Sequence, residues 1–231
     1  MIKRVTRVVC AASPSGSVQG IERLHQIADD RDAQAIVVVG DLGVGDRRHG
    51  SYRAVFRALA NDRHPAYWVP GPRDAPIGDY LRETHNIEVV HPLVRGVHGT
   101  VAFAPGHLLV AGLGGEISDD PEAPREEVDR LRYPRWEAEY RLKLLGELGE
   151  HDRLLAFSTP PAHRNIDAPG SDVVAELVGT WRPRIVVCPG PRPAVMLGSS
   201  LIVAPGSLAD GIYAVADLGA RDVEFGELVA A

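Results

Sequence analysis

The sequence predicts an α/β fold, because short apolar runs rich in β-branched residues alternate with segments of helical periodicity. Residues 5–10, 36–39 and 66–69 form such runs, and each ends abruptly in a polar loop. Between the first two runs, apolar side chains recur at three-residue spacing from Val18 to Ile27, which is typical of an amphipathic helix. A strand, a helix and a second parallel strand form a βαβ unit. The chain is therefore expected to begin with buried parallel strands joined by helices.

The length and composition favour one globular domain that spans residues 1–231. Hydrophobic residues make up 45% of the chain and charged residues 24%, a composition that can bury a sizeable core. The net charge is −6 and no basic block is present, which argues against a nucleic-acid partner. No apolar run approaches about eighteen residues, and the N-terminus lacks the pattern of a signal peptide. We therefore expect a cytoplasmic protein with no membrane contact.

Further elements are expected along the chain. Apolar residues at helical spacing predict helices over residues 52–59 and 77–83 and a longer one within residues 121–152, the last packed on the outside of the sheet. Residues 87–90 are expected to form a strand, and residues 97–115 a hairpin. Additional strands are expected at residues 154–157 and 185–188 and near the C-terminus, within residues 201–218. The two cysteines, Cys10 and Cys188, end apolar runs and are expected to be small buried residues.

The polar loops after these strands are the expected location of a functional site. In open α/β sheets, ligands bind just beyond the carboxyl ends of parallel strands. Asp41 follows the second run, and Arg73 and Asp74 follow the third. We therefore expect these three side chains to face a common crevice.

Four of these loops carry a resemblance to a known family. Their sequences are Gly40-Asp41, Gly71-Pro72-Arg73-Asp74, Ser158-Thr159-Pro160-Pro161 and Pro189-Gly190-Pro191-Arg192. This arrangement resembles the calcineurin-like metallophosphoesterases, hydrolases that hold two divalent metal ions at such loops. Residues 70–92 also resemble a small bacterial subgroup whose metal-ligand motifs are eroded in a similar way. The resemblance implies a four-layer α/β/β/α sandwich, in which two mixed sheets are flanked by helices.

The same resemblance implies a degenerate metal centre. At the positions where the family has its metal ligands and catalytic histidine, this chain has Ser13, Ser15, Pro72, Arg73, Ser158, Gly190 and Arg192. Asp41 matches the carboxylate that bridges the two metals, and Asp74 matches a residue that supports the catalytic histidine. Two divalent ions need several carboxylate or imidazole ligands. We expect no tight dinuclear site; one weakly bound divalent cation (Mn²⁺, Mg²⁺ or Ca²⁺) at Asp41, Asp74 and water molecules is still compatible with the sequence.

The replacements favour a protein that binds a phosphate-containing small molecule without hydrolysing it, a pseudoenzyme with a binding or regulatory role. Guanidinium groups bind phosphate without a metal, and hydroxyl and amide groups at a helix N-terminus favour anions. The residues assigned to this ligand-binding site are Ser13, Ser15, Asp41, Arg73, Asp74 and Arg192. A purely structural alternative is that the serine loop caps a helix, and that an arginine neutralises Asp41 or Asp74.

An enzyme is the second hypothesis. It is a metal-dependent phosphomonoesterase or phosphodiesterase with a rearranged site around Asp41 and Asp74, completed by Glu116 or His163. The sequence leaves open whether the chain catalyses a reaction, which phosphate compound it binds, and whether it forms a homo-oligomer.

Overall fold

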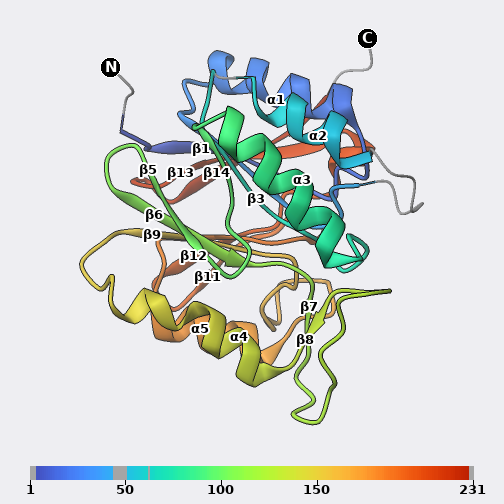
Figure 1. The fold of residues 1–231 in the computed structure, drawn as a ribbon. Helices are drawn as coiled ribbons and strands as arrows, with labels where there is room; N and C mark the ends of the chain where they lie inside the picture. The colour runs from blue at the N-terminus through green and yellow to red at the C-terminus, as the bar shows by residue number, and fades with distance from the viewer. Residues whose placement is uncertain (1–3, 44–50, 62, 229–231) are drawn as a thin grey trace.

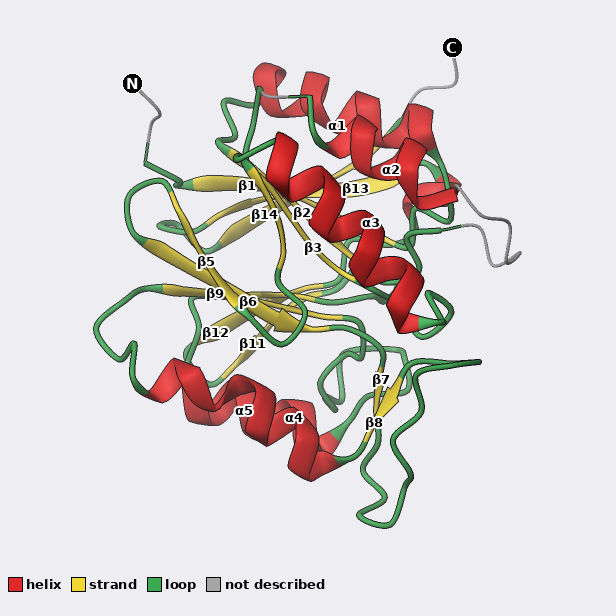
Figure 2. Ribbon diagram, viewed as in Figure 1, coloured by secondary structure: helices red, strands yellow, loops and turns green. Residues whose placement is uncertain are grey.

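Two six-stranded β-sheets stack face to face, and helices cover the outer face of each sheet (Figure 1, Figure 2). This arrangement is seen in a computed structural model that describes residues 4–43, 51–61 and 63–228. It confirms the four-layer α/β/β/α sandwich that the sequence predicts.

The first sheet contains the N-terminal βαβ units. Its strands are β1 (Arg7–Ala12), β2 (Ala35–Val39), β3 (Ala66–Val69), β4 (Val94–Gly96), β13 (Ile212–Asp217) and β14 (Asp222–Glu227). Strands β1 to β4 are mutually parallel. Strand β13 pairs with β1 in antiparallel orientation, and β14 pairs with β13 in antiparallel orientation. The outer face is covered by α1 (Val18–Asp30), α2 (Ser51–Leu59) and α3 (Ile77–Val90).

The second sheet is built from the later part of the chain. Its strands are β5 (Val101–Ala104), β6 (Leu108–Leu113), β9 (Arg153–Phe157), β10 (Ile185–Val187), β11 (Ala194–Leu197) and β12 (Ser200–Val203). The four central strands are parallel, and β5 and β11 are antiparallel edges. Its outer face is covered by α4 (Arg135–Leu142), the short helix η1 (Lys143–Gly146) and α5 (Asp172–Trp181). The small elements β7 (Glu116–Ile117), β8 (Arg132–Tyr133) and η2 (Leu208–Asp210) complete the fold.

Three layers of buried apolar side chains hold the sandwich together. Val37, Val110 and Leu154 belong to the layer between the two sheets and have almost no exposed surface. A second layer joins the first sheet to α1, α2 and α3, and a third joins the second sheet to α4 and α5. Both cysteines are fully buried. None of the helices that the structure describes combines the length and the apolar character needed to cross a bilayer.

The prediction of a strand at residues 87–90 is wrong, because α3 continues through this segment to Val90. No glycine or proline interrupts the sequence between Asp79 and Val90, so nothing stops the helix there. His91 precedes Pro92 and is extended, and a residue before proline is disfavoured in the helical conformation. The parallel strand forms later, as β4.

The long helix expected within residues 121–152 is much shorter in the structure. Pro134 precedes α4, which ends at Leu142, and η1 follows directly. As expected, the segment packs on the outside of the second sheet, through Ala138 and Leu142 of α4 and Leu145 of η1. Of the apolar residues whose spacing predicts the helix, Leu145 and Leu148 pack against the sheet, whereas Trp136, Tyr140 and Leu144 are exposed to solvent.

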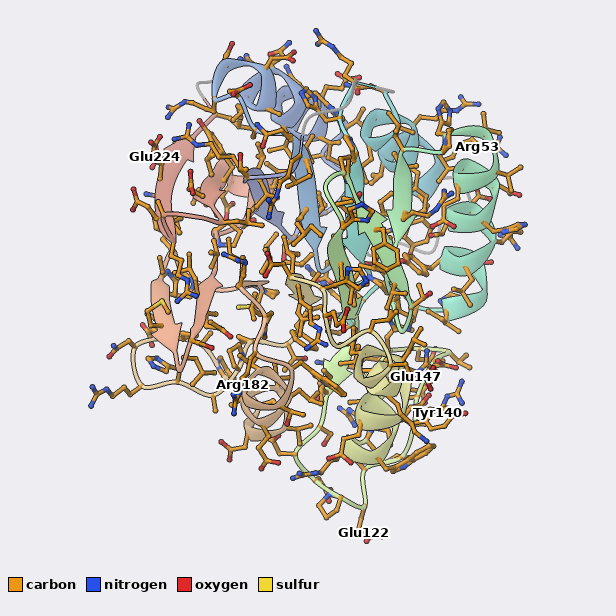
Figure 3. All side chains as sticks on the ribbon, turned by 90° about the vertical axis from the view of Figure 1, so that its left-hand side faces the viewer. Arg53, Glu122, Tyr140, Glu147, Arg182 and Glu224 are labelled. Carbon is orange, nitrogen blue, oxygen red and sulfur yellow. The ribbon has the colours of Figure 1, made fainter. Side chains whose placement is uncertain are left out.

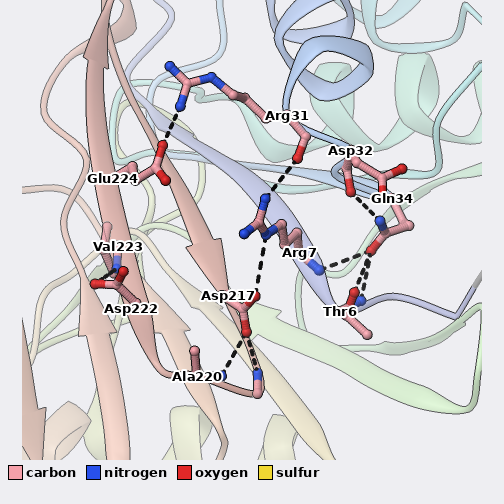
Figure 4. A network of polar contacts seen from close by, with 11 residues as sticks. Thr6, Arg7, Arg31, Asp32, Gln34, Asp217, Ala220, Asp222, Val223 and Glu224 are labelled. Atoms are coloured by element: carbon pink, nitrogen blue, oxygen red, sulfur yellow. Dashed lines mark hydrogen bonds and ion pairs between the residues drawn. The ribbon is translucent and has the colours of Figure 1, made fainter.

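Polar contacts fasten the outer strands of the first sheet to the end of α1 (Figure 4). The Arg7 guanidinium donates to Asp217 on β13 and to the Arg31 carbonyl after α1. Arg31 in turn pairs with Glu224 on β14. The Gln34 side chain accepts the backbone N–H of Arg7, which fixes the start of β1.

Candidate functional site

The loops that follow β1, β2, β9 and β10 meet at one edge of the sandwich. A Cβ atom built on Gly40 would lie 3.5 Å from the Pro189 ring, 3.6 Å from Ser13 Oγ and 4.0 Å from the Ser158 Cβ. Gly40 has a φ of 74°, a conformation that glycine adopts readily. The tertiary structure therefore brings together loops from both sheets, as expected for the carboxyl ends of parallel strands.

Asp41 and Arg73 form an ion pair at this edge. The Arg73 Nε lies 2.8 Å from Asp41 Oδ2, and the Arg73 backbone N–H donates to Asp41 Oδ1 over 3.0 Å. The Asp41 side chain is only 15% exposed, whereas that of Arg73 is 66% exposed. Both carboxylate oxygens of Asp41 thus accept hydrogen bonds from one residue, and the guanidinium stands directly against the carboxylate.

The close contact of the β2 and β3 loops requires glycine at position 71. A Cβ atom built on Gly71 would lie 1.9 Å from the Asp41 nitrogen and 2.3 Å from Asp41 Oδ1. No side chain fits there without moving the Asp41 backbone.

Asp74 is buried beneath this pair. Its carboxylate accepts hydrogen bonds from the backbone N–H groups of Leu42, Gly43 and Gly71, at 2.7, 2.9 and 2.7 Å, and from the Tyr52 hydroxyl at 3.2 Å. Burial raises the pKa of Asp74 to about 6, although the three amide donors act to lower it. The group is therefore ionised at neutral pH, and its donors fix the loops of β2 and β3 together.

The serine loop after β1 uses its backbone donors within the fold. The N–H groups of Ser15 and Gly16 donate to the carbonyls of Asp41 and Leu42, and that of Ser13 donates to Val39. The N-cap of α1 is Ser17, whose hydroxyl accepts from Gly20. These amides are thus occupied, and only the serine hydroxyls can serve a ligand.

Pro72 and Ser158, which the sequence analysis assigned to degenerate positions, also make internal contacts. The Pro72 carbonyl accepts the N–H of Leu131 at 2.9 Å. The Ser158 hydroxyl is 2.5 Å from the Gly115 carbonyl oxygen, to which it donates, and the residue is buried. Both residues thus link neighbouring loops through hydrogen bonds. The Pro72 side chain has no atom that could bind a metal, and the Ser158 hydroxyl is already used in a hydrogen bond.

A cavity of about 450 Å³ opens beside the serine loop. It lies between the β1 loop, the β10–β11 loop and the turn before β13, and it is lined by Ala12, Ser13, Pro189, Gly190, Pro191, Arg192, Gly206, Ser207, Asp210 and Ile212. Arg192 has a φ of 52°, and its guanidinium pairs with Glu227 on β14. The side chains of this pair are 42% and 69% exposed.

In the structure, the residues that the sequence analysis assigned to the site fall into two neighbouring groups. Ser13, Gly190 and Arg192 line the cavity, whereas Asp41 and Arg73 pair with each other. Sequence reasoning missed Asp210 and Glu227. No local sequence pattern identifies Asp210 and Glu227 as site residues. They lie near Ser13 and Arg192 only because of the strand order β14-β13-β1 and the packing of the two sheets.

Within residues 4–43, 51–61 and 63–228, the donors at this edge do not form a metal-binding group. No three His, Cys, Asp or Glu side chains of these residues are placed to hold a metal ion together. Glu116 pairs with Arg130 at 2.6 Å and with Arg132 at 3.3 Å. His163 Nδ1 accepts the N–H of Asn165. Of the two residues considered as substitute ligands, Glu116 is thus paired with two arginines, and His163 accepts a local backbone hydrogen bond at Nδ1.

Comparisons with known proteins agree with this fold. The family described as "Metallophosphoesterase, calcineurin superfamily" matches residues 1–228. The crystal structure of TT1561 of Thermus thermophilus is 42% identical, with a TM-score of 0.91 over 96% of this chain and 99% of that one. A dimetal phosphatase from Danio rerio is similar in fold, with 11% identity and a TM-score of 0.60 over 97% and 96% of the two chains. No curated protein matches the sequence. The chain belongs to the calcineurin-like metallophosphoesterase superfamily.

Proposed function

We propose that this protein keeps the metallophosphoesterase fold with a degenerate metal centre, and that it binds a phosphate-containing small molecule with little or no hydrolysis. The observation that carries the proposal is the Arg73–Asp41 ion pair. Arg73 Nε lies 2.8 Å from the carboxylate that the family uses to bridge two cations. A cation already neutralises this carboxylate, and the nearby serine, proline and arginine side chains do not fit a pair of divalent ions.

The cavity beside the serine loop supports the binding role. Arg192 and the Ser13 hydroxyl provide donors of the kind that bind phosphate. The Arg192–Glu227 pair is exposed, so it contributes only about 0–1 kcal/mol, and a phosphate group can replace Glu227. Asp210 lines the same cavity and repels phosphate but accepts hydroxyl groups. This combination favours a ligand with both a phosphate and free hydroxyls, such as a sugar phosphate or a nucleotide.

The binding proposal is tested by thermal denaturation with inorganic phosphate, sugar phosphates and nucleotides. A ligand at a hundred times its Kd stabilises the protein by about 2.7 kcal/mol, or about 5–10 °C in Tm for a chain of this size. Arg192→Gln should remove the shift. The matched control is Arg31→Gln, which also breaks an arginine–glutamate pair on β14 but lies away from the cavity. The absence of any ligand-dependent rise in Tm would refute a binding role.

The enzyme hypothesis is tested separately by hydrolysis of an aryl phosphoester with Mn²⁺. We expect no activity above background, and no Mn²⁺ or other divalent metal in elemental analysis of the purified protein. Activity that survives purification and disappears in Asp41→Asn would establish the alternative, a phosphoesterase with a rearranged site.

A further inference from the structure

The outward face of α4 and η1 carries a stripe of large apolar side chains. Trp136, Tyr140 and Leu144 recur every four residues and are 59%, 71% and 43% exposed. We call these three residues the α4 stripe. Single exposed apolar side chains are common on soluble proteins, but contiguous exposed apolar patches often mark an interaction site. Tyr140 and Glu147 mark the course of this helical segment in Figure 3.

A row of charges runs beside the α4 stripe with the same spacing. Arg135, Glu139, Lys143 and Glu147 are all exposed and alternate in sign along the helix. We call them the charged ridge. Arg135 pairs with Glu139 and with Glu176 on α5, whereas Lys143 and Glu147 form no ion pair with any residue in the described ranges.

The two rows together are complementary to themselves in one orientation. When a second copy packs antiparallel about position 141, Arg135 lies opposite the partner's Glu147, and Glu139 lies opposite the partner's Lys143. The apolar side chains then interdigitate, because Tyr140 falls between the partner's Tyr140 and the partner's Leu144. A parallel arrangement would instead place each charged side chain opposite the same residue of the partner, so that like charges meet. A two-fold interface requires this kind of self-complementary surface.

The α4 stripe can supply the apolar centre of a dimer interface. A stable interface buries about 800 Å² on each partner, and a fully buried aromatic side chain contributes about 150–250 Å², so the stripe supplies part of this area and the charged ridge supplies the polar rim. Val128, which is 65% exposed, adds to the apolar area from a neighbouring loop. That loop is fastened to α4 by Arg125–Glu137 and Glu127–Arg141 ion pairs. Aromatic residues are the side chains most enriched at the centre of interfaces.

We infer that the α4 stripe and the charged ridge form the interface of an antiparallel homodimer of this chain. The expected result is a dimer in sedimentation equilibrium of the wild-type protein at micromolar concentrations. Tyr140→Glu should raise the dimer dissociation constant by at least about thirtyfold, because the two copies of this residue meet at the centre. The matched control is Val89→Glu, an equally exposed position on α3, which should leave the constant unchanged.

A charge exchange tests the orientation. Glu139→Lys alone places two lysines against each other at two points and should weaken the dimer about tenfold or more. The double variant Glu139→Lys/Lys143→Glu restores opposite charges across the interface and should recover the wild-type constant. Circular dichroism of each variant shows whether the monomer stays folded.

Cross-linking tests the position of the two-fold axis. A Tyr140→Cys variant should form a disulfide-linked dimer under mild oxidation, whereas Val89→Cys should not. The two native cysteines are fully buried and burial raises the pKa of both thiols, so they do not compete. A wild-type protein that remains monomeric, or a dimer that Tyr140→Glu leaves intact, would overturn the inference.

Discussion

Asp74 shows how one buried side chain can hold two loops together. Its carboxylate accepts three backbone N–H groups from two loops and the hydroxyl of Tyr52 on α2. A buried amide without a partner costs about 1–3 kcal/mol. The aspartate therefore stabilises the edge of the sandwich whether or not any metal is bound nearby.

Removing this carboxylate should destabilise the protein strongly. Asp74→Ala leaves three buried N–H donors unpaired, so we expect the free energy of unfolding to fall by about 3 kcal/mol or more. Asp79→Ala is the control, because Asp79 pairs with Arg82 on the exposed face of α3 and should cost less than about 1 kcal/mol. Urea denaturation of both variants measures the difference. Equal effects would show that the hydrogen bonds to Asp74 contribute little.

Two glycines should respond to alanine in opposite ways. At Gly71 the added methyl group meets the Asp41 backbone at 1.9 Å, so Gly71→Ala must displace the β2 loop and should lower the Tm. At Gly78, on α3, nothing lies within 4 Å of an added Cβ. Gly78→Ala should therefore raise stability by about 0.5–1 kcal/mol. Thermal denaturation of the pair checks both signs, and a neutral Gly71→Ala would contradict the close approach of the loops.

At the scale of elements, a buried polar network fastens α4 and β8 to the second sheet. His98 Nδ1 accepts the N–H of Gly114 at 3.0 Å, so the neutral ring carries its proton on Nε2. That nitrogen is 3.2 Å from the Tyr133 hydroxyl, which donates to Glu127. Burial, and then the charge of Arg141, lower the pKa of His98 to about 3.

This network predicts a loss of stability in mild acid. The unfolded chain takes up a proton on His98 near its ordinary pKa of 6.5, but the folded protein does so only near 3. Stability that depends on neutral His98 is therefore complete above pH 6.5 and falls as the pH drops below it. The free energy of unfolding between about pH 7 and 5 should fall more steeply in the wild type than in His98→Gln. Parallel curves would show that His98 does not titrate as the structure implies.

The errors in predicting elements have local causes. Ile87, Val89 and Val90 have strand propensity, but the two valines are exposed at the end of a helix that no residue interrupts before Pro92. In α4 and η1, Trp136, Tyr140 and Leu144 recur at helical spacing but face solvent. Apolar spacing alone does not show which side of a helix packs on the sheet. The tertiary packing of Ala138 and Leu142 decided that point.

At the scale of the whole molecule, the two sheets share one apolar layer. Leu154 lies in this layer with no exposed surface. Because each sheet buries its inner face only against the other, the two halves should unfold together.

Cooperative unfolding can be measured with two tryptophans on different sheets. Trp68 lies in β3, and Trp181 ends α5 against the second sheet. In variants that retain only one of these two, with Trp136→Phe in both, the fluorescence and circular dichroism midpoints should coincide. Leu154→Ala should lower the free energy of unfolding by about 2–5 kcal/mol, whereas Leu81→Ala, on the exposed face of α3, should cost far less. Separate transitions would indicate two independent domains.

The candidate site was predictable only in part. The sequence placed Asp41, Arg73 and Asp74 at the ends of adjacent strands, because the βαβ pattern fixes where parallel strands end. The pairing of an arginine with Asp41 was only one of the alternatives that the sequence offered, and the sequence could not show that Arg73 makes this pair or that Arg192 turns towards Glu227. These partners are far apart along the chain, and only the packing of the sheets brings them together.

The sequence by itself determined the α/β class and the βαβ beginning, because hydrophobic periodicity and local motifs are written along the chain. The tertiary structure decided which loops meet, where Asp74 finds its donors, and which face of α4 remains exposed. Those features depend on contacts between distant segments, and such contacts form only when the apolar faces of the two sheets and their helices are buried together.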